Sequence, residues 1–267
     1  MCYNMMKVGD AFNGGAFMDY SVIIPVYNSS GSLMELLEEV EGFFKTIGKS
    51  HEVIFIDDCS QDGSWGIIED FARSRADVKA IRFNRNKGQQ YALLKGLAMA
   101  EGTYAVTMDD DLQHDINDLL KMIPLAEAGS DLVFGIYEEY GSRGLRSFGS
   151  KFIGYILRSQ FHNLGKMRVS SFRLIHNTVF TMALKEERAF SYLSAELLTH
   201  CTKVSNASVT RRSRIYGKSG YTLRKCLTIS LKILLYYGRY TKRFIRKVDE
   251  NEENIDGWCG KLPAQRN

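Results

Sequence analysis

Three consecutive carboxylates follow a short apolar segment near the middle of the chain. Residues 104–108 have the composition of a buried strand, and Asp109, Asp110 and Asp111 come directly after it. Adjacent negative charges repel one another, and a bound divalent cation with oxygen ligands relieves that repulsion. Because such a cation can also hold the diphosphate of a nucleotide, this segment predicts both a cofactor and a class of substrate.

The more ordinary explanation for a run of acids is a solvated loop or a helix start. Asp115 and Asp118 are placed to cap the helix that is expected to follow. His114 lacks the spacing of a metal-ligand set, so we expect it to make a local hydrogen bond. The choice between a solvated loop and a metal site therefore depends on the rest of the chain.

The elements that must position these acids follow from hydrophobic periodicity. Apolar segments of strand length alternate with helical patterns over residues 21–134, which predicts an α/β fold with a mostly parallel, twisted sheet and helices on both faces. The second strand, residues 53–56, also ends in acids, Asp57 and Asp58. Because ligands in such folds bind outside the carboxyl ends of the strands, we expect both sets of acids at one edge.

Local signals predict several element boundaries. Ser32 and Glu35 have the spacing of a capping box, which predicts a helix that begins there with a side-chain cap. Further on, the pattern predicts a helix over residues 151–161 and a strand over 169–175. A long, basic, amphipathic helix is predicted over residues 223–248, with apolar positions on one side at Leu223, Leu227, Leu231, Leu234 and Leu235.

The composition is that of one ordinary globular domain. With 267 residues, 45% hydrophobic and 25% charged, the chain can bury a full core. Five scattered cysteines, an odd number without metal-ligand spacing, indicate a reducing compartment. No apolar segment reaches about 18 residues, so no membrane span is predicted. We expect residues 1–19 to be a loose leader and residues 249–267 to be a polar, frayed tail.

Charge is distributed unevenly along the chain. Residues 197–248 contain thirteen Lys or Arg and no Asp or Glu, which leaves a net charge of −9 on the remainder of a chain whose total is +4. A basic segment on an otherwise acidic protein predicts an anionic partner, such as a phosphate or a membrane surface. Nucleic acid is disfavoured by the acidic remainder and by aromatic residues that cluster instead of alternating with the cations.

Taken in order, the motifs resemble those of the family 2 glycosyltransferases, which have the GT-A fold. The closest resemblance is to the group that makes polyprenyl-phosphate sugars, such as dolichol-phosphate mannose synthase. The segments that carry it are IIPVYN at 23–28, IDDCSQDGS at 56–64, NRNKG at 84–88, ALLKGL at 92–97, MDDDLQH at 108–114, SFRL at 171–174 and RIYGKSGY at 214–221. The chain departs from the family pattern in three ways. The fifth strand ends Gly135-Ile136-Tyr137, where many members have an Arg, and Ser170-Ser171 stands where many have an acid or Gly before the Phe-Arg-Leu. The C-terminal membrane spans of many bacterial relatives are not expected in this sequence.

The resemblance implies a role for each matching residue. Mg²⁺ or Mn²⁺ would be held by Asp109 and Asp111, and Asp58 is favoured over Asp57 as the residue that binds the nucleotide base. The residues expected to contact the nucleotide-sugar are Pro25, Tyr27, Asp57, Asp58, Lys87, Asp109 and Asp110. The expected catalytic residues are Asp109, Asp111, Gln113 and Arg214. The acceptor phosphate is expected to contact Arg143, Arg146, Arg214, Lys218 and Ser219.

The function implied by the resemblance is an inverting, metal-dependent transfer of a sugar from a UDP- or GDP-linked donor to a polyprenyl phosphate. Residues 20–135 would bind the donor and residues 136–222 the acceptor. The basic helix, residues 223–248, would hold the protein peripherally on the cytoplasmic face of an anionic membrane. A homo-oligomer is compatible with this arrangement.

Two alternatives stay open. A family 2 glycosyltransferase of O-antigen or capsule assembly would use a sugar hydroxyl as acceptor and would need a general base, for which Glu196 is the best candidate, ahead of Glu138 and Glu139. A more distant alternative is a non-catalytic module that binds nucleotide-sugar or nucleic acid. A dehydrogenase or a P-loop ATPase is disfavoured because neither glycine-rich phosphate motif is present.

Overall fold

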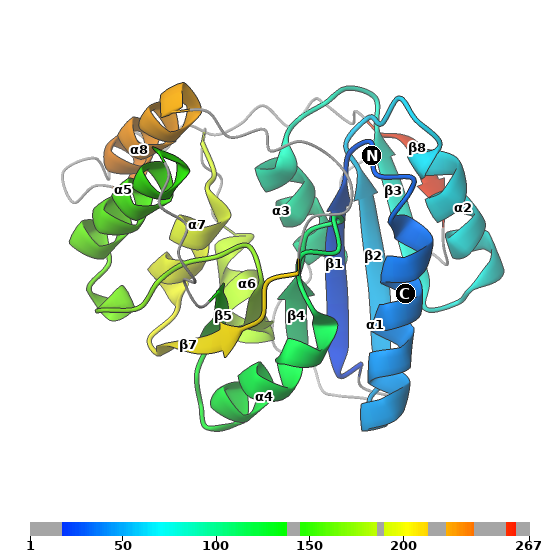
Figure 1. The fold of residues 1–267 in the computed structure, drawn as a ribbon, viewed down its shortest axis with the longest axis horizontal. Coiled ribbons are helices and arrows are strands. Elements are labelled where there is room, and N and C mark those ends of the chain that lie inside the picture. Colours follow the sequence, from blue (N-terminus) through cyan, green and yellow to red (C-terminus); the bar gives the residue numbers. More distant parts are fainter. Residues whose placement is uncertain (1–17, 138–144, 186–189, 213–222, 238–254, 260–267) are drawn as a thin grey trace.

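The computed structural model describes residues 18–137, 145–185, 190–212, 223–237 and 255–259. These residues form one mixed sheet with helices on both faces (Figure 1). The strands are β1 (Tyr20–Val26), β2 (His51–Asp57), β3 (Val78–Phe83), β4 (Tyr104–Thr107), β5 (Leu132–Tyr137), β6 (Arg173–His176), β7 (Val204–Val209) and β8 (Ile255–Cys259). The helices are α1 (Leu33–Ile47), α2 (Ser64–Ser74), α3 (Gln89–Met99), α4 (Leu119–Glu127), α5 (Leu145–Gln160), α6 (Asn177–Ala183), α7 (Leu193–His200) and α8 (Leu223–Tyr237), with 3₁₀ turns at Ile116–Asp118 and His162–Leu164.

The strand order across the sheet is β7-β5-β6-β4-β1-β2-β3-β8. The pairs β1–β2, β2–β3, β1–β4 and β5–β7 are parallel, whereas β6 is antiparallel to both β4 and β5. The predicted mostly parallel, mixed sheet is therefore confirmed. The chain builds β1, β2 and β3 in one direction and then places β4 on the other side of β1. This reversal between β1 and β4 is the point where open α/β sheets bind ligands.

The carboxyl ends of β1 and β4 separate at this point. The ladder between them ends at the pair Ile23–Thr107, followed by one bond from Met108 N–H to the Ile23 carbonyl. The β1–β2 ladder continues further, to Val26. Pro25 lies two residues after Ile23, so its nitrogen faces the same side of β1 as the Ile23 carbonyl, which is the side of β4. The β1–β4 ladder has already ended there, so no hydrogen bond from a backbone N–H is lost. The two strands therefore stop pairing directly before the three acids that follow β4.

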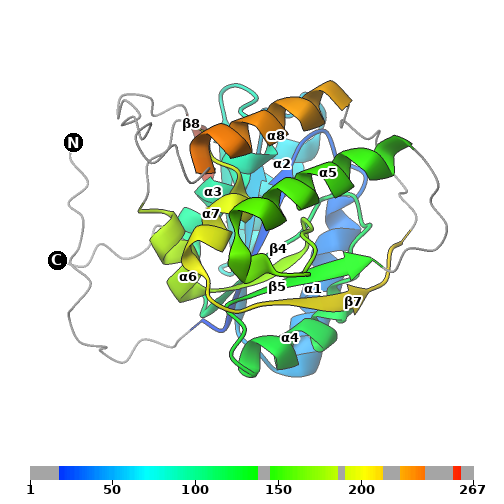
Figure 2. The same ribbon diagram turned by 90° about the vertical axis from the view of Figure 1, so that its left-hand side faces the viewer.

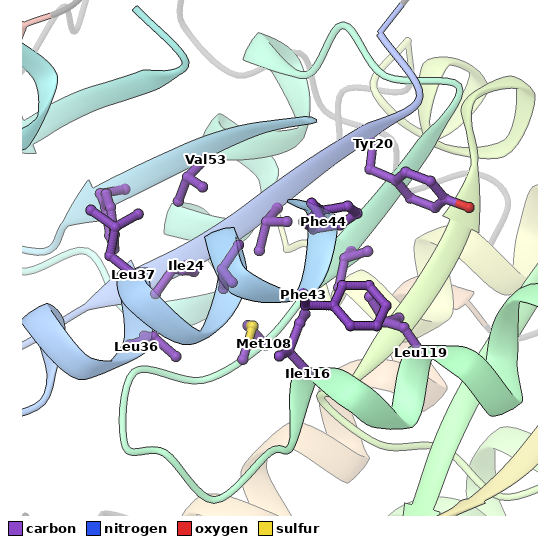
Figure 3. Packing of buried hydrophobic residues seen from close by; sticks show 14 of the residues in the cluster. Tyr20, Ile24, Leu36, Leu37, Phe43, Phe44, Val53, Met108, Ile116 and Leu119 are labelled. Carbon is purple, nitrogen blue, oxygen red and sulfur yellow. The ribbon is translucent and has the colours of Figure 1, made fainter. Parts of the chain in front are cut away.

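Alternating side chains divide the core into two layers. Val22, Ile24 and Val26 of β1 join a cluster under α1, α2 and α4, whereas Ile23 joins a cluster under α3 and α5–α8. Figure 2 shows α4 below strands β5 and β7, and α5 and α8 above them. In the first cluster, Phe43 and Phe44 of α1 pack toward β1 and toward the loop that follows β4 (Figure 3). The buried face of α1 thereby supports the acid-bearing loop from beneath.

Two local predictions are wrong, each for a physical reason. Ser32 precedes α1 as predicted, but its hydroxyl makes no cap; it donates to the carbonyls of Ser29 and Asp110 instead. A tertiary partner has replaced the expected capping box. The tail expected to be frayed contains β8, which pairs antiparallel with β3, because the edge of β3 offers backbone groups that another strand can satisfy.

The last described helix, α8, packs beside α5 (Figure 2). Ser230 and Ile233 are buried on its inner face. Four of the five leucines predicted to share one side are exposed to solvent, with Leu227 at 60% and Leu231 at 59% and with Leu234 and Leu235 beside them. The side chain of Leu223 lies outside the described part of the chain. Residues 238–248 of the predicted helix lie outside the described part of the chain. Among the described helices, none combines the length and the apolar character needed to cross a membrane.

Candidate active site

Asp109, the first residue of the acid run, is held by neutral hydrogen-bond donors. Its Oδ1 accepts from Gln89 Nε2 at 2.6 Å and its Oδ2 accepts from Ser171 Oγ at 2.7 Å. These donors come from the start of α3 and from the segment before β6, so the carboxylate is fixed from two sides. The Asp109 side chain remains 28% exposed. Its charge is oriented and still accessible to solvent.

His114 also holds Asp109 in place, through the Asp109 backbone. Its Nδ1 accepts the backbone N–H of Asp109 at 3.1 Å, and its Nε2 lies 3.4 Å from Ser171 Oγ. Burial lowers the pKa of His114, although Asp109 and Asp111 oppose that shift, so the ring is neutral at pH 7. Because Nδ1 accepts, the proton of the neutral ring is assigned to Nε2, facing Ser171. The local hydrogen-bonding role predicted for His114 is confirmed.

Asp110 joins the acid loop to the end of β1. Its Oδ2 accepts the backbone N–H of Tyr27 at 3.0 Å, and its carbonyl accepts the Ser32 hydroxyl at 2.6 Å. Burial raises the pKa of Asp110 to about 6, against the opposing hydrogen bonds from Ser29 and Tyr27. The side chain of Tyr27 itself is half exposed beside this junction.

Asp58 anchors the turn that begins α3. Its Oδ1 accepts from Lys87 N–H at 2.6 Å and its Oδ2 accepts from Gly88 N–H at 2.8 Å. Gly88 has φ +89°, a conformation that side chains rarely adopt. Gln89 follows at once and binds Asp109, so one short turn connects the acids after β2 and β4. Burial raises the pKa of Asp58, while the two N–H groups oppose the shift.

Asp57 and Pro25 have structural surroundings. Asp57 is fully buried and pairs with Arg82 Nε at 3.2 Å. Burial raises its pKa, and the Ser60 hydrogen bonds and Arg82 oppose that effect. Pro25 is buried within β1.

A sharp turn follows the acids. Leu112 is buried and has φ +59°, which is uncommon for a residue with a branched side chain. The turn brings the Gln113 N–H to Oδ1 of Asp111 at 3.2 Å, and Arg211 Nη2 lies 3.5 Å from the Gln113 side-chain oxygen. Asp115 caps the 3₁₀ turn through the Asn117 N–H, as predicted, whereas Asp118, which precedes α4, makes no side-chain cap. Such strained backbone is typical of functional loops.

The sequence model of the family described as "Glycosyl transferase family 2" matches residues 21–190, well over half of the chain. The chain belongs to glycosyltransferase family 2. The curated relatives to which it is similar include undecaprenyl-phosphate 4-deoxy-4-formamido-L-arabinose transferases. That of Pseudomonas aeruginosa is 28% identical over 80% of this chain and 63% of the relative, and that of Proteus mirabilis is 29% identical over 80% and 66%. The chain thus spans just under two thirds of the length of these relatives.

Solved structures share the fold of this family 2 chain. S. aureus TarS 1–349 in complex with UDP-GlcNAc has a TM-score of 0.56 and 20% identity, covering 82% of this chain and 67% of its own. Glucosyl-3-phosphoglycerate synthase from Mycobacterium tuberculosis, in complex with Mn²⁺, UDP-glucose and phosphoglyceric acid, has a TM-score of 0.58 and 19% identity, covering 82% and 78%. The predicted GT-A fold is confirmed.

The oxygen ligands that the acid loop offers fit a hard divalent cation. Asp109 and Asp111 present carboxylate oxygens, and the donors that hold Asp109 are uncharged. Across the described ranges, no three His, Cys, Asp or Glu side chains converge as a complete metal site. The protein would therefore supply one or two carboxylate ligands to the cation. The diphosphate of the nucleotide-sugar and water would supply the remaining ligands, as is usual for Mg²⁺.

The structure brings together several of the residues expected to contact the donor, and most of the residues expected to contact the acceptor lie outside the described part of the chain. Asp58, Lys87, Asp109 and Asp110 are linked through the contacts above. Arg143, Arg214, Lys218 and Ser219 lie outside the described residues, and only the backbone of Arg146, in the first turn of α5, is described. The residues that sequence reasoning missed are Gln89, Ser171 and Arg211. The only sequence signal was at Ser171, which departs from the family pattern.

Proposed function

We propose that the protein is an inverting glycosyltransferase that moves a sugar from a nucleoside-diphosphate sugar to a polyprenyl phosphate. The observation that carries this proposal is the position of Asp109 and Asp111 at the β1–β4 reversal, with Asp109 tied through Gln89 to the turn that binds Asp58. The names of the relatives support an undecaprenyl-phosphate acceptor. The structural neighbours bound to UDP-sugars, one of them with Mn²⁺, support the donor and the metal.

The donor would lie between the carboxyl ends of β1 and β4. Tyr27 and Pro25 would border the nucleotide, Asp58 would lie at the base, and Asp110 and Lys87 would flank the diphosphate. UDP and GDP donors both fit this assignment. Mg²⁺ or Mn²⁺ would bind at Asp109 and Asp111 and, once bound, stabilise negative charge on the departing diphosphate.

The transfer step needs orientation more than proton abstraction. A phosphate oxygen of the acceptor forms a bond to the anomeric carbon, and the bond from that carbon to the diphosphate breaks on the opposite face. A phosphate monoester is already ionised near neutral pH, so no general base is required. Gln113, whose backbone is held by Asp111, would orient the sugar. Arg143, Arg146, Arg214, Lys218 and Ser219 would hold the acceptor phosphate.

A lipid acceptor would require the protein to act at a membrane surface. The outer face of α8 exposes leucines at 227, 231, 234 and 235, within a segment of thirteen cations and no acids. Apolar side chains among cations are the composition of helices that lie in the interface of anionic bilayers. We therefore place α8 on the cytoplasmic face, as a peripheral contact.

A transfer assay tests the proposal. The full chain is incubated with UDP- and GDP-sugars and undecaprenyl phosphate in anionic vesicles, with Mn²⁺ or EDTA, and the nucleoside diphosphate and glycolipid are quantified. We expect product only with metal and lipid phosphate together, and a loss of about 100-fold or more in Asp111→Asn. Asp70→Asn, on the exposed surface of α2, is the matched control. Turnover that persists in EDTA or without lipid phosphate would rule the proposal out.

The hydroxyl-acceptor alternative gains no support from its proposed base. Glu196 lies in α7, is 1% exposed, and accepts the hydroxyl of Tyr237 on α8. A carboxylate buried in that contact is poorly placed to deprotonate an incoming sugar. Glu138 and Glu139 lie outside the described residues.

A further inference from the structure

Four side chains from separate segments form a continuous stack beside the acid loop. The guanidinium carbon of Arg211 lies 5.4 Å from the ring centroid of Tyr137. Tyr137 stacks on His114 with centroids 5.8 Å apart, and His114 stacks on Phe172 at 5.0 Å. Phe172 is fully buried and Arg211 is exposed. The stack therefore runs from the core to the rim of the site.

The backbone around Arg211 is fixed to the acid loop on both sides. The N–H of Thr210 donates to Asp118 Oδ2 at 2.7 Å, and the N–H of Arg212 donates to the Gln113 carbonyl at 3.1 Å. Arg211 itself forms a β-bridge with His114. Its position relative to the catalytic loop is thus determined by several backbone contacts, and the Tyr137 ring directs the side chain.

The two neighbouring arginines differ in how their charge is used. Arg212 pairs with Glu39 at 2.5 Å and with Asp115 at 3.0 Å, which neutralises it within the fold. For Arg211, no carboxylate lies within 4.0 Å in the described part of the chain, and its side chain donates to the uncharged Gln113 amide. A guanidinium held over a ring and not neutralised by an acid is suited to bind an anion, above all a phosphate.

The topology indicates which phosphate this is. The donor-side groups, Asp58 and Lys87, follow β2 and precede α3, on one side of β4. Arg211 follows β7, and Tyr137 ends β5, on the other side of β4. Gln113 lies between the two sides. An anion at Arg211 therefore approaches the sugar from the side opposite the nucleotide, where the acceptor must enter for inversion.

We propose that Arg211 binds the phosphate monoester of the acceptor, and that the Tyr137–His114–Phe172 stack is the platform that aims its guanidinium toward Gln113. The inference rests on the proposed function and assigns the acceptor's headgroup to a residue outside the family-derived set. Tyr137 is a positioning residue in this scheme, because it acts through Arg211.

The test uses farnesyl phosphate, farnesol and inorganic phosphate as probes of the full chain. Binding is measured calorimetrically with UDP and EDTA present, and KM values for farnesyl phosphate and for the donor are measured with Mn²⁺. We expect Arg211→Ala to weaken farnesyl phosphate binding and raise its KM by about 10-fold or more, with the donor KM and farnesol binding unchanged. Inorganic phosphate should lose affinity in parallel if the headgroup alone is recognised.

Matched variants separate a binding role from damage to the fold. Arg211→Lys keeps the charge and should recover part of the affinity. Tyr137→Phe keeps the ring and should resemble wild type, whereas Tyr137→Leu should raise the KM for farnesyl phosphate without changing that for the donor. Arg73→Ala removes an exposed arginine of α2 and should change neither constant.

The outcomes distinguish the phosphate-binding role of Arg211 from the proposed glycosyltransferase function. If wild type transfers sugar to farnesyl phosphate while Arg211→Ala binds that probe normally, the inference is wrong and the proposed function stands. If Arg211→Ala raises the donor KM instead, the cation serves the nucleotide diphosphate and the inference is again wrong. A wild-type protein that transfers no sugar under any metal and donor condition contradicts the proposed function itself.

Discussion

The side-chain amide of Gln89 donates to Oδ1 of Asp109 at 2.6 Å. Gln89 begins α3 directly after Gly88, whose N–H binds Asp58 at 2.8 Å. The acid that follows β2 and the acid that follows β4 are therefore connected through two consecutive residues, Gly88 and Gln89. A substitution in the turn that binds Asp58 should therefore also change the position of the Asp109 carboxylate.

Replacing Gln89 with Ala removes one of two donors that orient Asp109. We expect kcat/KM to fall about 10-fold, because a hydrogen bond to a charged group is worth about 1.5–3 kcal/mol. The adjacent Gln90→Ala is the control: Gln90 Oε1 accepts the Leu193 N–H at 2.8 Å and joins α3 to α7. That variant should lose about 1 kcal/mol of stability in urea unfolding, with a smaller effect on kinetics. Full activity in Gln89→Ala would contradict the orienting role.

Replacing Gly88 with Ala forces a side chain into a backbone with φ +89°. We expect a loss of about 1–2 kcal/mol in the free energy of unfolding and a weaker affinity for nucleotide, because the N–H to Asp58 shifts. Gly66→Ala, in helix α2 with open space around it, should instead be neutral or stabilising by up to about 1 kcal/mol. Denaturant unfolding measures the stability of both variants, and UDP titration measures their nucleotide affinity. Equal stability and equal affinity in the two variants would contradict the prediction for Gly88.

The pH dependence of stability should carry a contribution from His51. This side chain stacks on Phe44 at 4.5 Å, and burial lowers its pKa below the ordinary value of 6.5. The unfolded chain therefore binds a proton between pH 6.5 and the lower folded pKa, so stability falls as pH falls through that window. His51→Gln should flatten the dependence between pH 7.5 and 5 relative to wild type in urea unfolding. An unchanged slope would show that His51 does not contribute; His114, shifted in the same direction, remains in both proteins.

The leucine face of α8 should decide attachment to membranes. We expect Leu227→Glu and Leu231→Glu to reduce sedimentation with phosphatidylglycerol vesicles by about 5-fold or more while leaving the melting temperature nearly unchanged, since both side chains are already exposed. Met34→Glu, an exposed apolar side chain on α1, should bind vesicles like wild type. Binding that survives in both α8 variants would place the membrane contact elsewhere.

The sequence by itself determined the elements and the acids at their ends. The buried strand over residues 104–107, its three following carboxylates and the helix face of α1 depend on periodicity and local chemistry, which are legible within a short window. The alternation of strands and helices determined the parallel part of the sheet and therefore the edge at which Asp58 and Asp109 would lie. Motif order added the family.

Only the tertiary structure decided which side chains hold and complete that edge. Asp109 meets Gln89 across 20 residues and Ser171 across 62, and Gln113 meets Arg211 across 98. No local pattern specifies such partners, because they depend on where β6 and β7 lie in the sheet. The same holds for Ser32, whose hydroxyl binds the Asp110 carbonyl instead of capping α1, and for the leucines of α8, which face solvent because Ser230 and Ile233 meet the core.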